Sequence, residues 1–170
     1  MKLFISALSI VTLCFGHCAL AQENQAQANV DIKKLYVGAG FNHNRIDGSS
    51  MGSVDGKTSG FQVFAGYEYG QRSGIDIAAE AGIIQTGEFY DGSGEDADGI
   101  WAAAVASKHL PEIHNKLTGV ARLGYGLGGD DGLLMGFGAQ VQVHPQAVIR
   151  LEYINKDLTQ SYQLNAVYQF

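Results

Sequence analysis

The sequence has few cysteine, proline and basic residues, and each shortage excludes a class of protein. Its two cysteines, Cys14 and Cys18, lie in an N-terminal segment that we expect to be removed, so the remaining chain would have no disulfide framework. Two prolines in 170 residues exclude a proline-rich disordered chain. Eleven Lys and Arg against seventeen Asp and Glu give a net charge of −6, and no basic run suits a nucleic acid.

The N-terminal segment has the pattern of a secretory signal peptide. It reads MKLFISALSIVTLCFGHCALA, with Lys2, an uncharged apolar stretch and a small-residue Ala-Leu-Ala ending at Ala21. The alternative is an uncleaved signal anchor, but Gly16 and His17 make this segment less suitable as a membrane-spanning helix. Cys18 does not follow the small residues of a lipoprotein signal, so we expect no lipid anchor. We therefore predict a signal peptide over 1–21, a flexible polar leader over 22–33 and one domain over 34–170.

Long apolar runs are absent after the predicted signal. No stretch approaches the roughly 20 residues that a membrane helix needs. The chain has 23 glycines and is rich in Tyr and Phe, a composition typical of strands joined by tight turns. If this domain crosses a membrane, it therefore does so as strands.

Eight segments alternate large apolar with small or polar residues, the two-residue period of a β-strand. In the fourth segment alanine marks neither face, and we place Trp101, Ala103 and Val105 on the apolar side; an alanine-rich helix is the alternative there. The connections after the second, fourth and sixth segments are short, and the first two on the other side are long. This predicts an all-β, eight-stranded antiparallel up-and-down transmembrane β-barrel. The segments cover residues 35–42, 61–69, 75–83, 100–110, 120–127, 133–144, 149–153 and 161–170.

Alternation alone does not say which face lies inside the barrel. A soluble barrel of the lipocalin type would hold its apolar face inside, but the lumen of an eight-stranded barrel is only wide enough for side chains to fill it. Here the apolar face carries nearly all the bulk, and the opposite face is largely Gly, Ala and scattered charge. We therefore predict that the bulky face contacts lipid and the small face lines the lumen.

The large aromatic residues fall near the two ends of the predicted strands, where the interfaces of a bilayer favour them. The predicted girdle near the long loops comprises Phe41, Phe61, Trp101, Tyr125, Tyr153 and Tyr162, and the girdle near the short turns comprises Tyr67, Tyr69, Tyr168 and Phe170.

With this pattern the sequence resembles the small eight-stranded outer-membrane β-barrel family of Gram-negative bacteria, the OmpA-type transmembrane domain and its opacity-like relatives. The resemblance covers nearly all of residues 34–170. It implies that the last strand, which ends on Tyr168 and Phe170, carries the signal read by the barrel-assembly machinery. Asn165 stands where that signal commonly has glycine, so the match is imperfect. It also implies an outer-membrane location, with lipid and lipopolysaccharide as partners and a monomeric state.

Seven charged residues are predicted to face the lumen, where charges must pair because an isolated one costs several kcal/mol. One interpretation is a structural ion-pair network that plugs the barrel. The other, which the resemblance suggests, is a switchable gate in which Arg150 pairs with Glu68. The seven are Glu68, Asp76, Glu80, Lys108 (if the phase of its strand is right), Arg122, Arg150 and Glu152.

An acidic loop, EFYDGSGEDADG, follows the third segment and offers a weak candidate for Ca²⁺. Its carboxylates do not follow the order of an EF-hand, because Asp96 stands at the position of the turn glycine. We expect a solvated loop and no metal or other cofactor. The candidate ligands are Asp91, Glu95, Asp96 and Asp98.

Enzymatic activity is not expected. Some eight-stranded barrels modify lipid A with a serine that a histidine assists, but His43, His109, His114 and His144 have no serine two residues later. A pair could still form across strands. The sequence thus favours an integral outer-membrane barrel with an envelope-structural or surface-interaction role, with a narrow channel second and a lipid A-modifying enzyme third.

Overall fold

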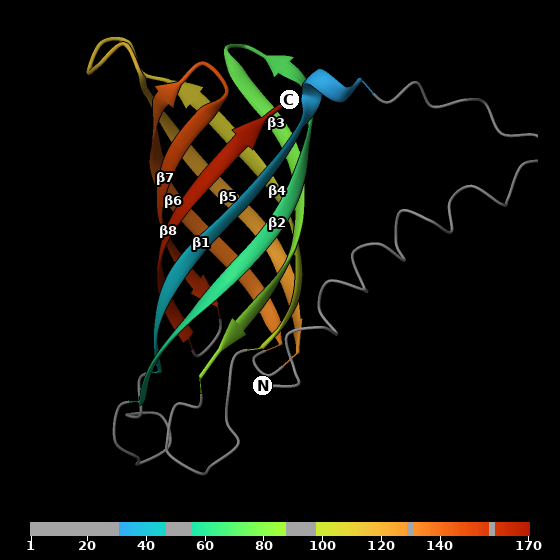
Figure 1. The fold of residues 1–170 in the computed structure, drawn as a ribbon, viewed down its shortest axis with the longest axis vertical. Coiled ribbons are helices and arrows are strands. Elements are labelled where there is room, and N and C mark those ends of the chain that lie inside the picture. Colours follow the sequence, from blue (N-terminus) through green and yellow to red (C-terminus); the bar gives the residue numbers. More distant parts are fainter. Residues whose placement is uncertain (1–30, 47–55, 88–97, 129–130, 157–158) are drawn as a thin grey trace, which may run out of the picture. The chain divides into compact units, whose positions relative to one another are not determined.

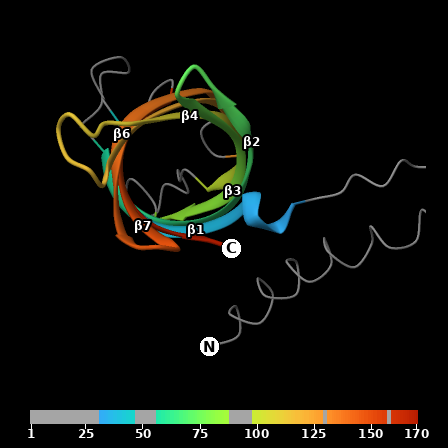
Figure 2. The same ribbon diagram turned by 90° about the horizontal axis from the view of Figure 1, so that it is seen from above.

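The chain folds into a closed, fully antiparallel barrel, as Figures 1 and 2 show for a computed structural model. The structure describes residues 31–46, 56–87, 98–128, 131–156 and 159–170. Each strand pairs with the next along the chain, and β8 pairs with β1. The predicted fold class is confirmed. The strands are β1 (Leu35–Ile46), β2 (Gly56–Arg72), β3 (Ile75–Thr86), β4 (Gly99–His109), β5 (Leu117–Gly128), β6 (Gly132–His144), β7 (Ala147–Lys156) and β8 (Thr159–Gln169).

The first and last strands close the cylinder. Tyr36 lies opposite Gln169 in the β1–β8 ladder, and the Phe170 amide donates to the Leu35 carbonyl at 3.2 Å. A short 3₁₀ helix, η1 (Ile32–Lys34), precedes β1. This helix and Phe170 lie at the same end as the three short connections, the upper end in Figure 1. The predicted signal peptide and residues 22–30 of the predicted leader lie outside the described residues.

The hairpin between β2 and β3 differs from the predicted turn at residues 70–73. Strand β2 continues to Arg72, which pairs with Ile75, and the turn is formed by Ser73 and Gly74. Both turn residues have positive φ, 53° and 76°, which fits the two-residue turns that join twisted antiparallel strands. Gly70 instead marks a register shift within the ladder, so this glycine belongs to a bulge.

Seven of the strands point their bulky apolar face outward, as predicted. Phe137 is 66 % exposed, Leu151 60 % and Leu164 52 %. Alternate residues on the same strands are buried, among them Arg150 and Asn165. An outer wall of this composition would be costly in water, at roughly 25 cal/mol for each Å² of apolar surface, whereas lipid solvates it.

The predicted phase of β4 is wrong. Trp101, Ala103 and Val105 are 8 %, 7 % and 3 % exposed and face the lumen, while Ile100 is 56 % exposed. The physical reason is the partner of the indole, because the Trp101 ring lies 4.7 Å from the Arg122 guanidinium carbon. Trp101 therefore does not belong to an outer girdle. Lys108 shares the outward parity of Ile100 and is exposed, so its assignment to the lumen is also wrong.

The remaining girdle residues lie on the outer face at the predicted ends, and several form ring pairs. Near the long loops the rings of Tyr153 and Tyr162 lie 5.2 Å apart. Near the short turns the Tyr168 and Phe170 rings meet edge to face at 5.4 Å. Within the described ranges no helix has both the length and the apolar composition to cross a membrane.

Candidate functional site

Four charged side chains from three strands meet at the centre of the lumen. Arg122 on β5 lies 2.6 Å from a Glu80 carboxylate oxygen on β3 and 3.0 Å from one of Glu152 on β7. Arg150, also on β7, contacts the second oxygen of Glu80 at 2.6 Å. All four side chains are at most 5 % exposed. We call this set the central cluster; its two arginines and two glutamates give it no formal net charge.

Neutral polar groups add hydrogen bonds to the central cluster, although Arg122 Nε and one carboxylate oxygen of Glu152 have no partner among the described residues. The Tyr36 hydroxyl donates to Glu80 at 2.8 Å, and Arg150 Nε donates to the Gln140 side-chain oxygen at 3.1 Å. Asn165 donates to Glu152 at 3.4 Å. Buried charges are tolerated when their remaining donors and acceptors are satisfied, so these groups lower the cost of placing four ions in the lumen.

Aromatic rings from the lumen wall flank the two guanidinium groups. Besides its contact with Trp101, Arg122 lies 5.8 Å from the Phe64 ring centroid, and Arg150 lies at the same distance from that ring. Contacts of this kind contribute about 0.5–2 kcal/mol each. The Phe64 ring is therefore shared between the two arginines.

Glycines on neighbouring strands make room for these large lumen residues. A Cβ at Gly38 would lie 2.2 Å from the Phe64 ring, and one at Gly66 would lie 2.1 Å from the Tyr36 ring. Any larger side chain would displace these aromatic residues. The small face predicted from the sequence is thus a surface into which a few bulky residues pack.

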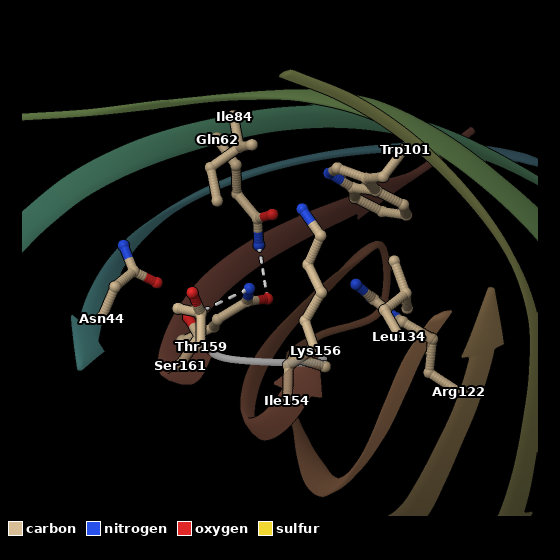
Figure 3. A pocket seen from close by; sticks show the side chains of 11 residues that line it. Asn44, Gln62, Ile84, Trp101, Arg122, Leu134, Ile154, Lys156, Thr159 and Ser161 are labelled. Carbon is tan, nitrogen blue, oxygen red and sulfur yellow. Dashed lines mark hydrogen bonds between the residues drawn. The ribbon is translucent and has the colours of Figure 1, made fainter. Parts of the chain in front are cut away.

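A layer of neutral amides and hydroxyls lies between the central cluster and the long loops. Gln62 on β2 donates to Gln163 and to Asn165 on β8, both at 2.8 Å. A cavity of about 40 Å³ adjoins this amide layer, and Figure 3 shows Gln62, Trp101 and Lys156 extending into the same space. It is large enough for a few water molecules.

The other side of the central cluster, towards the short turns, is acidic. Glu68 accepts from Gln169 at 3.4 Å, and Asp76 accepts from Gln71 at 2.9 Å. Both carboxylates line a cavity of about 20 Å³ together with Arg150. The central cluster therefore separates two small cavities.

Of the seven predicted lumen charges, the structure brings four together as the central cluster. Glu68 and Asp76 line the short-turn cavity and are not part of the central cluster. Lys108 lies on the outer face of the barrel. The suggested pair of Arg150 with Glu68 is not the one observed, because Arg150 bonds Glu80. Sequence reasoning missed Tyr36, Phe64 and Gln140, whose only signal was bulk or polarity on a face otherwise rich in glycine.

The acidic loop adds little to the described structure. Asp91, Glu95 and Asp96 lie outside the described residues, and Asp98 accepts a hydrogen bond from the Thr86 amide at 2.5 Å. Within the described ranges no group of three metal-ligating side chains occurs.

A serine and a histidine do pair across two strands, on the outer wall. Nδ1 of His43 on β1 and the Ser59 hydroxyl on β2 lie 3.0 Å apart. The tautomer of the ring decides which of the two donates. Acyl transfer also needs donors for an oxyanion, whereas the backbone around these residues belongs to the barrel ladder. The pair by itself is therefore no catalytic constellation, and the absence of enzymatic activity stays a prediction.

The barrel was compared with known protein families, curated proteins and solved structures. No protein-family model and no curated protein matches the chain. Among solved structures, Neisserial surface protein A is similar with a TM-score of 0.54 and 17 % identity, over 81 % of this chain and 97 % of that one. Ail, the attachment invasion locus protein of Yersinia pestis, gives 0.52 and 20 %, over 80 % and 97 %.

A designed protein completes the comparison. A de novo transmembrane β-barrel matches with a TM-score of 0.57 and 14 % identity, over 82 % of this chain and 98 % of that one. At these identities the likeness concerns the fold. The chain has the fold of the small eight-stranded outer-membrane β-barrels, as its resemblance to that family implied.

Proposed function

We propose that this protein is an integral outer-membrane barrel of a Gram-negative bacterium, with a structural role in the envelope or a role in surface interactions through its loops. The observation that carries the proposal is the combination of an apolar outer wall with the central cluster inside. The outer wall requires lipid as its surroundings. The central cluster fills the middle of the lumen, which favours a closed barrel over an open pore.

The partners follow from this placement. The outer wall contacts lipid and lipopolysaccharide, and the short turns face the periplasm, as in other outer-membrane barrels. A barrel without an open sheet edge needs no second copy to pair with, which supports a monomer. Tyr168, near the end of β8, and Phe170, directly after it, are both exposed, and we assign them to recognition by the barrel-assembly machinery.

Fractionation combined with gel mobility tests the proposal. The full chain is expressed in a Gram-negative host, and the membranes are separated on a density gradient. We expect the processed protein in the outer-membrane fraction, with a faster band on unboiled than on boiled gels because the closed barrel survives detergent. Recovery in a soluble fraction without detergent would overturn the proposal.

A narrow channel is the second candidate, favoured by the position of Arg150. This side chain bonds Glu80 in the central cluster and also lines the cavity that contains Glu68 and Asp76. Exchange of its carboxylate partner would open a path between the two cavities. The test is single-channel recording in planar bilayers with Arg150→Ala. Altered conductance supports a gate, and traces identical to those of the unchanged protein leave only the structural role.

A further inference from the structure

The cavity of about 40 Å³ beside the amide layer has two chemically different halves. We call it the loop-side cavity. The described side chains that the neighbouring strands β8, β1 and β2 contribute to its wall are amides and hydroxyls. The strands from β3 to β7 contribute four apolar side chains and two basic ones. The polar half includes Asn44, Gln62 and Thr159, and the other half includes Trp101, Leu134 and Ile154 (Figure 3).

Three buried polar atoms without a hydrogen-bond partner among the described residues belong to this wall. They are the side-chain oxygen of Gln62, Nε of Arg122 and the hydroxyl of Thr159. The three residues are 1 %, 5 % and 4 % exposed. The Gln62 nitrogen already makes both bonds to β8, so its oxygen is left as an acceptor. Native proteins rarely leave such atoms unsatisfied, which indicates a bound molecule that both donates and accepts.

The charges around the loop-side cavity favour an uncharged ligand. None of the described side chains that line it carries a carboxylate, but Arg122 is already paired with Glu80 and Glu152. Lys156, the second cation in the wall, has an interaction of its own. Arg122 therefore offers a single N–H donor, and an anion that accepted from it would have no hydrogen to donate to the Gln62 oxygen.

Size and shape narrow the class of ligand further. A cavity of about 40 Å³ has room for roughly three water molecules, or one compound of about four non-hydrogen atoms. Water would find no hydrogen-bond partners along Leu134 and Ile154, whereas a short hydrocarbon group packs against them. A primary amide has one carbonyl acceptor and two N–H donors, the set that Arg122, Gln62 and Thr159 require.

We propose that the loop-side cavity binds a small uncharged amide of about the size of acetamide. Its carbonyl accepts from Arg122 Nε, and its nitrogen donates to the Gln62 oxygen and the Thr159 hydroxyl. Its alkyl group packs against Leu134 and Ile154. This site goes beyond the proposed envelope role, because it gives the lumen a ligand of its own.

The test uses the full chain folded in detergent micelles, with acetamide and its isosteric anion acetate as the probes. Trp101, the single tryptophan of the chain, lines the cavity, so its fluorescence reports binding. We expect a saturable change with acetamide and a dissociation constant in roughly the millimolar range, as is usual for so small a ligand. Acetate should bind more weakly. Tighter binding of acetate, or no saturable change with acetamide, would overturn the proposal.

Thr159→Val keeps the volume and removes one hydrogen bond to the ligand, so acetamide should bind roughly 5-fold more weakly. The control is Thr118→Val on β5, at the short-turn end and outside the wall of the cavity, which should leave the affinity unchanged. Equal losses in the two variants, or no loss in Thr159→Val, would overturn the site.

Folding of each variant is checked by the mobility shift on unboiled gels. If Thr159→Val does not fold, Leu134→Phe serves in its place; it narrows the apolar half and should abolish the saturable change, whose persistence would overturn the site. The comparison of acetamide with acetate needs no variant. Because binding is measured in micelles, its failure is separable from failure of the outer-membrane location, which fractionation tests.

Discussion

The central cluster and the amide layer on its long-loop side occupy the same lumen but connect the strands through different interactions. The cluster joins β3, β5 and β7 through charged contacts of 2.6–3.0 Å. The amide layer joins β2 and β8 through neutral hydrogen bonds and adjoins a cavity. Both layers join strands that are not neighbours in the sheet, the cluster through charged contacts and the amide layer through neutral hydrogen bonds. We therefore predict that substitutions in the central cluster lower the free energy of unfolding more than substitutions in the amide layer do.

The largest effect is expected at Glu80, which binds both arginines of the central cluster. Glu80→Gln keeps the volume but leaves the cluster with excess positive charge, so the free energy of unfolding should fall by about 3–5 kcal/mol. Denaturant titration of the barrel in detergent measures this, with the fluorescence of Trp101, the single tryptophan of the chain, as the signal. Glu68→Gln, near the short turns, is the matched control and should cost less than about 1 kcal/mol. Equal costs at the two positions would contradict the distinction.

A smaller effect is expected when both partners are replaced by apolar residues. Glu80→Leu with Arg150→Met removes one charge of each sign, so the double variant should be less destabilised than the sum of the single variants, with a coupling of about 0.5–3 kcal/mol. The same titration on all four proteins of the cycle gives this coupling. Strict additivity would mean that the 2.6 Å contact contributes nothing of its own.

The smallest effect is expected in the amide layer. Gln62→Leu leaves the acceptor oxygens of Gln163 and Asn165 without their donor but also removes an oxygen that has no partner within the described residues, so its cost should be about 1–2 kcal/mol. Its control is Gln71→Leu, an exposed residue at the short-turn end of the same strand, which should be nearly neutral. If Gln62→Leu lowered the free energy of unfolding as much as Glu80→Gln does, the two layers would contribute equally to stability.

The sequence predicted the strands, their order and the outward face where side chains differ in size. It failed in β4, since an alanine run carries no phase and the tryptophan was assigned to a girdle. It also failed on the partner of Arg150, because pairing across a lumen depends on the stagger of strands that do not touch. Glu68 and Glu80 both have inward parity, and only the three-dimensional register distinguishes them.

The orientation of the two faces is tested most directly by quenching of tryptophan with lipids brominated on their acyl chains. The barrel is placed in such bilayers, with Trp101 compared against Leu151→Trp in a Trp101→Phe background. The account predicts weak quenching of Trp101, which lies inside beside Arg122, and strong quenching at position 151. Quenching of Trp101 as strong as that at position 151 would contradict it.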